Sequence, residues 1–207
     1  PRPPSWSAPG AALSAHVPSC ALHPPNAFNS ASSITAAVGW AGSSDDQLAL
    51  LDHLGLARFH AMWGCIGSSF ALGLCQAAPN RVTAAVLQNP IGLSNGNRPK
   101  FNAMFEDWSD QMRPTHAELD DSAAAAFRDR MFGGDFVFTV DRDFVRSCKT
   151  PLLVMPGGDD FHPRAVAVEI VGLAPDAKLL SPWGGDANRA NTLNEVRSFL
   201  LAHTPGD

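Results

Sequence analysis

The sequence predicts an α/β protein with a mostly parallel sheet and helices on both faces. Val82 to Leu87 is a near-continuous apolar run, which is typical of a parallel strand covered on both faces. Short apolar runs also alternate with helical patterns, and this alternation implies crossover connections within one sheet. The chain has 207 residues, 45% of them hydrophobic, which suits one domain with a small insertion.

Composition argues against several classes of partner. A net charge of −5 with scattered basic residues provides no basic surface for nucleic acid or an anionic membrane, so we expect neither partner. No apolar run approaches the roughly 18 residues of a membrane span and no signal-peptide pattern is present, so we expect a cytoplasmic protein. The four cysteines lie far apart and lack metal-ligand spacing. We therefore expect free thiols, no metal and no cofactor.

The first predicted helix and strand follow a stretch of unusual composition at the start of the chain. Residues 1–45 are crowded with proline, alanine and serine and carry almost no charge. By composition alone this part would be a flexible leader. A helix is expected at 46–54, capped by Ser44 or Asp45, and a strand at 57–63 follows it.

The most informative stretch runs from Phe59 to Leu74, where an apolar strand meets a glycine turn and then a small-residue helix. This order lifts the side chain of Cys65 to the rim of the sheet, beside the free N–H groups of the helix start. The helix dipole there favours a thiolate, so the sequence indicates a nucleophile position. The alternative is a buried structural cysteine, as most free cysteines are.

The second half contains an insertion and the rest of the sheet. Between Gly92 and Lys149 the pattern changes to polar helices, one of them expected at 120–131, with a brief extended segment at 136–140. Aromatic and methionine side chains in this region, spaced three and four apart, form one amphipathic face. The remaining elements are expected as a strand at 151–156, a helix at 163–173, a strand at 177–181 and a helix at 191–202.

The stretch around Cys65 resembles the α/β-hydrolase superfamily. The resemblance covers the helix from Asp46 to Leu56, the elbow itself and the segment from Ala78 to Pro90. The family elbow reads Gly-x-Ser-x-Gly, with cysteine as the nucleophile in a minority such as the dienelactone hydrolases. Gly67 matches the second glycine, but Trp63 replaces the first.

The resemblance also implies a domain division. Residues 1–91 and 150–207 would form the hydrolase-like core, in which 1–45 match the family poorly and lack its first strands. Within 1–45, residues 13–22 resemble a strand that Pro18 interrupts, and a proline inside a central strand removes a hydrogen bond of the sheet. Residues 92–149 would form a helical cap insertion over the substrate.

The catalytic groups implied by the resemblance are only partly present. Gly157, Asp160 and Pro163 match the family's Gly-x-x-Asp-x-x-Pro, which makes Asp160 the triad acid and leaves Asp159 as the fallback. An Asp-rich surface turn is the alternative. The family's histidine follows the last strand, but none occurs at 182–185.

Two further groups complete the predicted site. His162 is the one histidine on the rim loops, so it is the candidate base; the alternative is a loop histidine with local hydrogen bonds. The backbone N–H of Ile66 is the candidate oxyanion donor. A second donor from an earlier loop has no counterpart.

The resemblance implies a hydrolase of a carboxylic ester, lactone or thioester that works by acyl transfer through Cys65 and is weak or inactive if no base replaces the histidine. One alternative is a non-catalytic relative that binds a small apolar carbonyl compound or a protein partner. Another is a truncated or damaged form of an enzyme. The missing early strands also favour a homo-oligomer, because they expose a sheet edge.

Overall fold

The computed structural model of the protein describes residues 20, 33–34 and 39–205. Within them, four strands form one parallel sheet in the order β1-β2-β3-β4. The strands are β1 (Phe59–Gly64), β2 (Val82–Gln88), β3 (Leu152–Met155) and β4 (Ala177–Leu179). Since all four run in the same direction, their carboxyl ends meet at one edge of the sheet. The expected parallel α/β architecture is confirmed.

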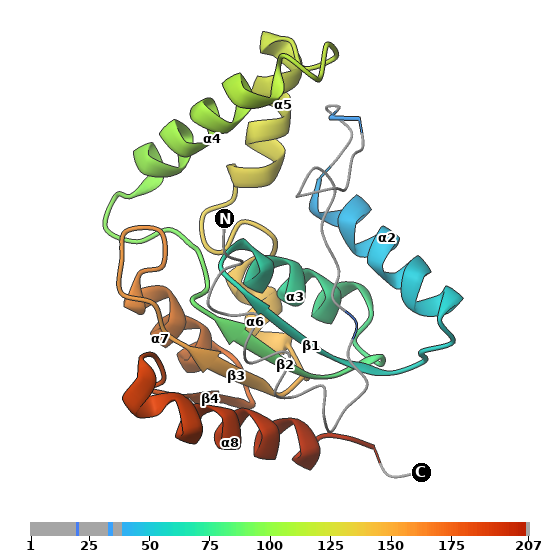
Figure 1. Ribbon diagram of the computed structural model, residues 1–207, viewed down its shortest axis with the longest axis vertical. Coiled ribbons are helices and arrows are strands. Elements are labelled where there is room, and N and C mark those ends of the chain that lie inside the picture. The colour runs from blue at the N-terminus through green and yellow to red at the C-terminus, as the bar shows by residue number, and fades with distance from the viewer. Residues whose placement is uncertain (1–19, 21–32, 35–38, 206–207) are drawn as a thin grey trace.

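Helices cover both faces of this sheet. The described residues contain α2 (Trp40–His53), α3 (Ile66–Ala77), α4 (Arg98–Met112), α5 (Asp121–Phe132), α6 (Arg142–Ser147), α7 (Arg164–Leu173) and α8 (Asp186–Ala202). Side chains of α3, α6 and α7 pack on one face with alternate residues of β2 and β3, and α8 packs on the other face with the intervening residues. Figure 1 shows α3 and α8 on opposite sides of the strands.

Three boundaries differ from the sequence prediction. α2 begins at Trp40 with Gly39 as its N-cap, not at residue 46, because the buried Trp40 ring is anchored by a 3.0 Å hydrogen bond from Nε1 to the carbonyl of Met131. α8 begins at Asp186 instead of residue 191. Residues 136–140, all buried except the partly exposed Thr139, form bends and no strand. The predicted segment at 13–22 lies, apart from Cys20, outside the described residues.

Helices α4 and α5 stand away from the sheet (Figure 1). Their side chains contribute to an aromatic cluster. We call this group the cap cluster; its buried members include Phe101, Phe105, Phe132 and Phe138. Partly buried side chains from the elbow and from the loop after β3 pack against it: Trp63, Ile66 and Phe161. The cap cluster therefore continues to both sides of Cys65.

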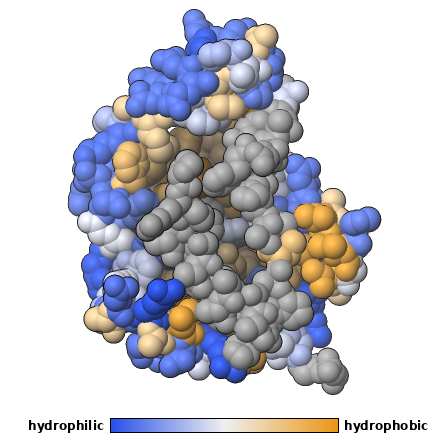
Figure 2. Space-filling model, viewed as in Figure 1, coloured by the Kyte–Doolittle hydropathy of each residue, from blue (hydrophilic) through white to orange (hydrophobic). Residues whose placement is uncertain are grey.

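The end of α2 carries an exposed apolar patch. Leu50, Leu54 and Leu56 are 38–48% exposed, and we call them the leucine patch. Figure 2 shows apolar side chains gathered over this end of α2. Among the described residues, no helix has the length and apolar character needed to cross a bilayer.

Candidate active site

Cys65 occupies a strained turn between β1 and α3. Its backbone has φ 58° and ψ −130°, a conformation that non-glycine residues rarely adopt and that costs on the order of 1–3 kcal/mol. Two hydrogen bonds hold this turn, from Cys65 N–H to Gln88 O at 2.9 Å and from Ser68 N–H to Cys65 O at 3.0 Å. The Cys65 side chain is exposed at the carboxyl edge of the sheet, where a nucleophile would meet substrate.

Gly67 compensates for the tryptophan at the first glycine position of the motif. A Cβ on Gly67 would lie 2.8 Å from Trp63 Cβ, so only glycine leaves room for Trp63 there. The fully buried Ser68 donates its hydroxyl within 3.2 Å to the carbonyls of Trp63 and Gln88, which ties α3 to β1 and β2. The tight turn therefore forms without the first glycine.

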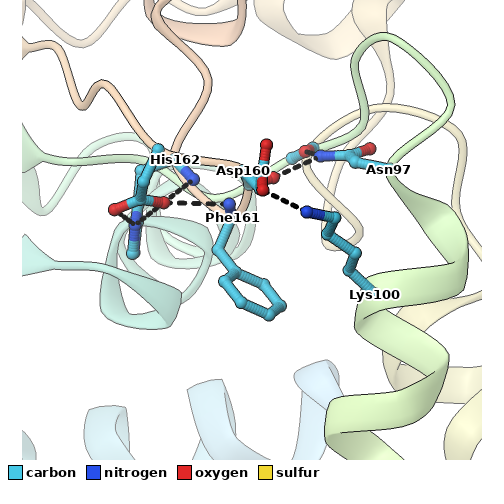
Figure 3. A network of polar contacts seen from close by, with 7 residues as sticks. Asn97, Lys100, Asp160, Phe161 and His162 are labelled. Atoms are coloured by element: carbon cyan, nitrogen blue, oxygen red, sulfur yellow. Dashed lines mark hydrogen bonds and ion pairs between the residues drawn. The ribbon is translucent and has the colours of Figure 1, made fainter.

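The loop after β3, residues 157–162, brings a carboxylate and an imidazole together; we call it the acid–base loop. Asp159 Oδ1 accepts hydrogen bonds from the backbone N–H groups of Phe161 and His162, both at 2.9 Å. His162 Nδ1 lies 2.8 Å and 2.9 Å from the two carboxylate oxygens of Asp159 (Figure 3). Desolvation would raise the pKa of Asp159, but the His162 N–H and imidazole hold that pKa below its usual value.

The other ring nitrogen of His162, Nε2, is buried and has no hydrogen-bond partner among the described residues. The Cys65 thiol is nevertheless near enough to be the largest cause of a raised pKa at His162; burial opposes this rise and Asp159 adds to it. Asp159 is thus paired with His162, and Cys65 lies near enough to His162 to affect its pKa.

Asp160, expected as the acid, does not contact His162. Its carboxylate forms an ion pair with Lys100 on α4, and both side chains are more than half exposed. Its backbone carbonyl accepts a 2.8 Å hydrogen bond from Asn97 (Figure 3). The two bonds to backbone N–H groups turn the Asp159 side chain toward the imidazole, so the carboxylate that contacts His162 is that of the fallback residue Asp159.

The segment at 182–185, where the resemblance would put a histidine, contains Trp183 and no histidine. Trp183 donates from Nε1 to the carbonyl of Pro156 at 2.8 Å, which closes the loop after β4 against the end of β3. A pocket of about 330 Å³ lies between these loops and includes Asp159 and Arg164 in its wall. The described segment therefore lines this pocket, whose wall includes neither Cys65 nor His162, and contributes no base.

Two other histidines are engaged elsewhere. His116 Nδ1 lies 2.9 Å from Glu118, a contact that lowers the pKa of this carboxyl to about 2. His60 sits between the hydroxyls of Thr83 and Thr204. Neither contact places a base beside Cys65.

Ile66 begins α3, so its N–H lies in the first turn of the helix, where backbone donors lack intrahelical acceptors. Among the described residues, no group accepts a hydrogen bond from this N–H. It is therefore available for an oxyanion next to Cys65. Within the described ranges, no cluster of three or more His, Cys, Asp and Glu side chains could hold a metal ion.

No protein family model matches this sequence, and no curated protein matches it. Solved structures do. A meta-cleavage product hydrolase from Pseudomonas fluorescens is 13% identical with a TM-score of 0.54, over 87% of this chain and 75% of the other. A serine hydrolase from Cycloclasticus zankles is 18% identical with a TM-score of 0.54, over 92% and 77%. An α/β hydrolase from a Medee basin deep-sea metagenome is 17% identical with a TM-score of 0.58, over 87% and 78%. At these identities the likeness establishes the fold.

Proposed function

We propose that this chain, which has the α/β-hydrolase fold, hydrolyses a carboxylic ester, lactone or thioester through a covalent acyl-cysteine. The pairing of Asp159 with His162, together with the exposed thiol of Cys65 at the elbow, is the observation that carries the proposal. His162 takes the thiol proton, the sulfur attacks the carbonyl carbon, and the Ile66 N–H binds the developing oxyanion. His162 then protonates the leaving group and later activates the water that cleaves the thioester.

The surroundings of Cys65 favour a substrate with an apolar acyl group. Trp63 and Ile66 flank the thiol, Phe161 precedes the base, and all three join the cap cluster. An apolar acyl chain or ring buried here would gain about 25 cal/mol per Å² of area removed from water. Helices α4 and α5 would then act as the cap over the substrate, with no nucleic acid, membrane or cofactor required.

The cysteines agree with a reducing compartment such as the cytoplasm. All four are free, and Cys75 and Cys148 remain thiols although their side chains meet in the core. Burial and contact with Cys148 raise the pKa of the Cys75 thiol, which favours its neutral, unreactive form.

Replacement of the two neighbouring carboxylates tests the proposal. Hydrolysis of p-nitrophenyl acetate and of longer p-nitrophenyl esters is followed for the wild type and for Cys65→Ala, His162→Gln, Asp159→Asn and Asp160→Asn. Cys65→Ala should abolish nitrophenol release, and His162→Gln should lower the rate about 10²- to 10⁴-fold. Asp159→Asn should cause a large loss, whereas Asp160→Asn, the matched control, should remain near wild type.

Three outcomes discriminate between a complete acyl-transfer enzyme, a protein that is acylated once and stalls, and a non-catalytic binding protein. Sustained turnover that disappears in His162→Gln supports the complete acyl-transfer cycle. A single burst followed by a stall, unchanged in His162→Gln, means that His162 is no base. No release by the wild type toward any ester favours the non-catalytic alternative, a protein that binds an apolar carbonyl compound or a protein partner.

A further inference from the structure

The acid–base loop lies against the first turn of α4, and Asn97 makes the buried part of this contact. Asn97 is the N-cap residue of α4 and is only 8% exposed. Its Nδ2 donates to the carbonyl of Asp160 at 2.8 Å and to the carbonyl of Gly92 at 3.0 Å, and its Oδ1 accepts from Ser94 N–H at 3.0 Å. The side-chain amide is thus fully engaged in fixing backbone (Figure 3).

The backbone carbonyl of Asp160 lies in the part of the acid–base loop that orients Asp159 and His162. It lies one residue after Asp159 and two before His162, so its position sets how both side chains point. Two weaker contacts reach the same segment from α4: the exposed ion pair between Lys100 and the Asp160 carboxylate, and the edge-to-face packing of Phe101 on Phe161 with ring centroids 5.2 Å apart. An exposed ion pair adds little, whereas loss of Asn97 would remove the donor to the part-buried carbonyl of Asp160 and to the buried carbonyl of Gly92.

We propose that Asn97 is a positioning residue, which holds the acid–base loop so that the imidazole of His162 meets the thiol of Cys65. This inference rests on the proposed function in one respect, the use of His162 as the base. The inference adds a second role for the start of α4. This segment contributes side chains to the cap cluster, and it also aligns the proton-transfer groups.

Asn97→Ala tests the proposal, with two readouts. The first is the titration of the His162 ring, followed by NMR and identified with His162→Gln. Since the thiol of Cys65 is the largest cause of the raised pKa, displacement of the loop should bring this pKa back toward 6.5. The second is the rate of the nitrophenol burst from p-nitrophenyl acetate, which should fall about 10²-fold for a displacement of about 1 Å.

Two neighbours on α4 provide matched controls. Arg98 donates to the carbonyls of Phe132 and Gly134, both at 2.7 Å, so Arg98→Ala loosens the start of α4 from the end of α5 without touching the acid–base loop. Lys100→Ala removes only the exposed ion pair with Asp160. Both variants should keep the His162 titration and hold the burst rate within about twofold.

Asn97→Asp supplies a second test, because it retains an acceptor for Ser94 N–H and removes the donors to the carbonyls of Asp160 and Gly92. It should reproduce the displaced titration of His162 even if Asn97→Ala fails to fold. An unchanged titration in Asn97→Asp, or equal effects in Arg98→Ala and Asn97→Ala, overturns the proposal. Absence of any burst in the wild type would count against the proposed function alone, since the titration still reports the position of His162.

Discussion

Substitution of Gly157 by alanine should displace His162 from Cys65. Gly157 begins the acid–base loop, and the loop folds back so closely that a Cβ on Gly157 would overlap the Cβ and the carbonyl oxygen of His162. Ordinary van der Waals contact begins at 3.4 Å, so relief of the overlap moves His162 by about 1 Å. The obstacle includes backbone, so rotation of a side chain cannot relieve it.

The expected cost follows from this displacement. A misplacement of about 1 Å in a catalytic group lowers the rate on the order of 10²-fold, which corresponds to about 2.7 kcal/mol of barrier. The assay is the rate constant of the first nitrophenol burst from p-nitrophenyl acetate, measured at saturating ester so that it reports acylation of Cys65 and excludes binding.

The adjacent glycine provides the control. A Cβ on Gly158 would meet no atom within 4 Å, so Gly158→Ala should acylate at nearly the wild-type rate. Both variants need the same thermal unfolding midpoint for the comparison to count. An unchanged burst rate in Gly157→Ala would show that the approach of His162 to Cys65 does not limit acylation, and the argument from geometry would fail.

Three further predictions concern reactivity, pH and assembly. Iodoacetamide near neutral pH should label Cys65 well before Cys75, because Cys65 is exposed and Cys75 is buried with a raised pKa; equal, slow labelling would contradict the elbow assignment. Since the folded-state pKa of His162 is raised, its contribution to the free energy of unfolding is full below about 6.5 and is lost as the pH rises through the raised value. Urea titrations should therefore show the advantage of the wild type over His162→Gln shrinking as the pH rises above about 6.5. Because β1 pairs only with β2 among the described residues and the leucine patch is exposed nearby, light scattering should show dimers or larger species; a monomer at all concentrations would contradict this.

The sheet and most helices could be predicted because their signals are local. The apolar run of β2 and the proline after α3 fix those elements from a few residues each. The start of α2 could not be predicted, because the anchor of Trp40 is the carbonyl of Met131, 91 residues away. Long-range contacts of this kind leave no periodic pattern in the segment that they stabilise.

The site also has parts that local sequence signals predict and parts that depend on contacts between distant residues. The position of Cys65 follows from strand, turn and helix, which are adjacent in sequence. The choice between Asp159 and Asp160 depends on two backbone hydrogen bonds, although aspartate often bonds the backbone two residues on, as Asp159 does with Phe161, and this tendency could have favoured Asp159. Asn97 had no sequence signal, because its partner Asp160 is 63 residues away.

Because Asp159 and His162 lie in one six-residue loop, the distance of both side chains from Cys65 depends on the position of that loop. When acid and base sit on separate loops, either can drift, and intermediate states with a misoriented imidazole arise. Here the shared backbone hydrogen bonds carry carboxylate and imidazole together, so movement of the loop changes mainly the gap to the sulfur. The imidazole would then have two positions relative to the sulfur, engaged and disengaged, and the hydrogen bond from Trp183 to the carbonyl of Pro156 would tie the loop after β4 to the point where the acid–base loop begins.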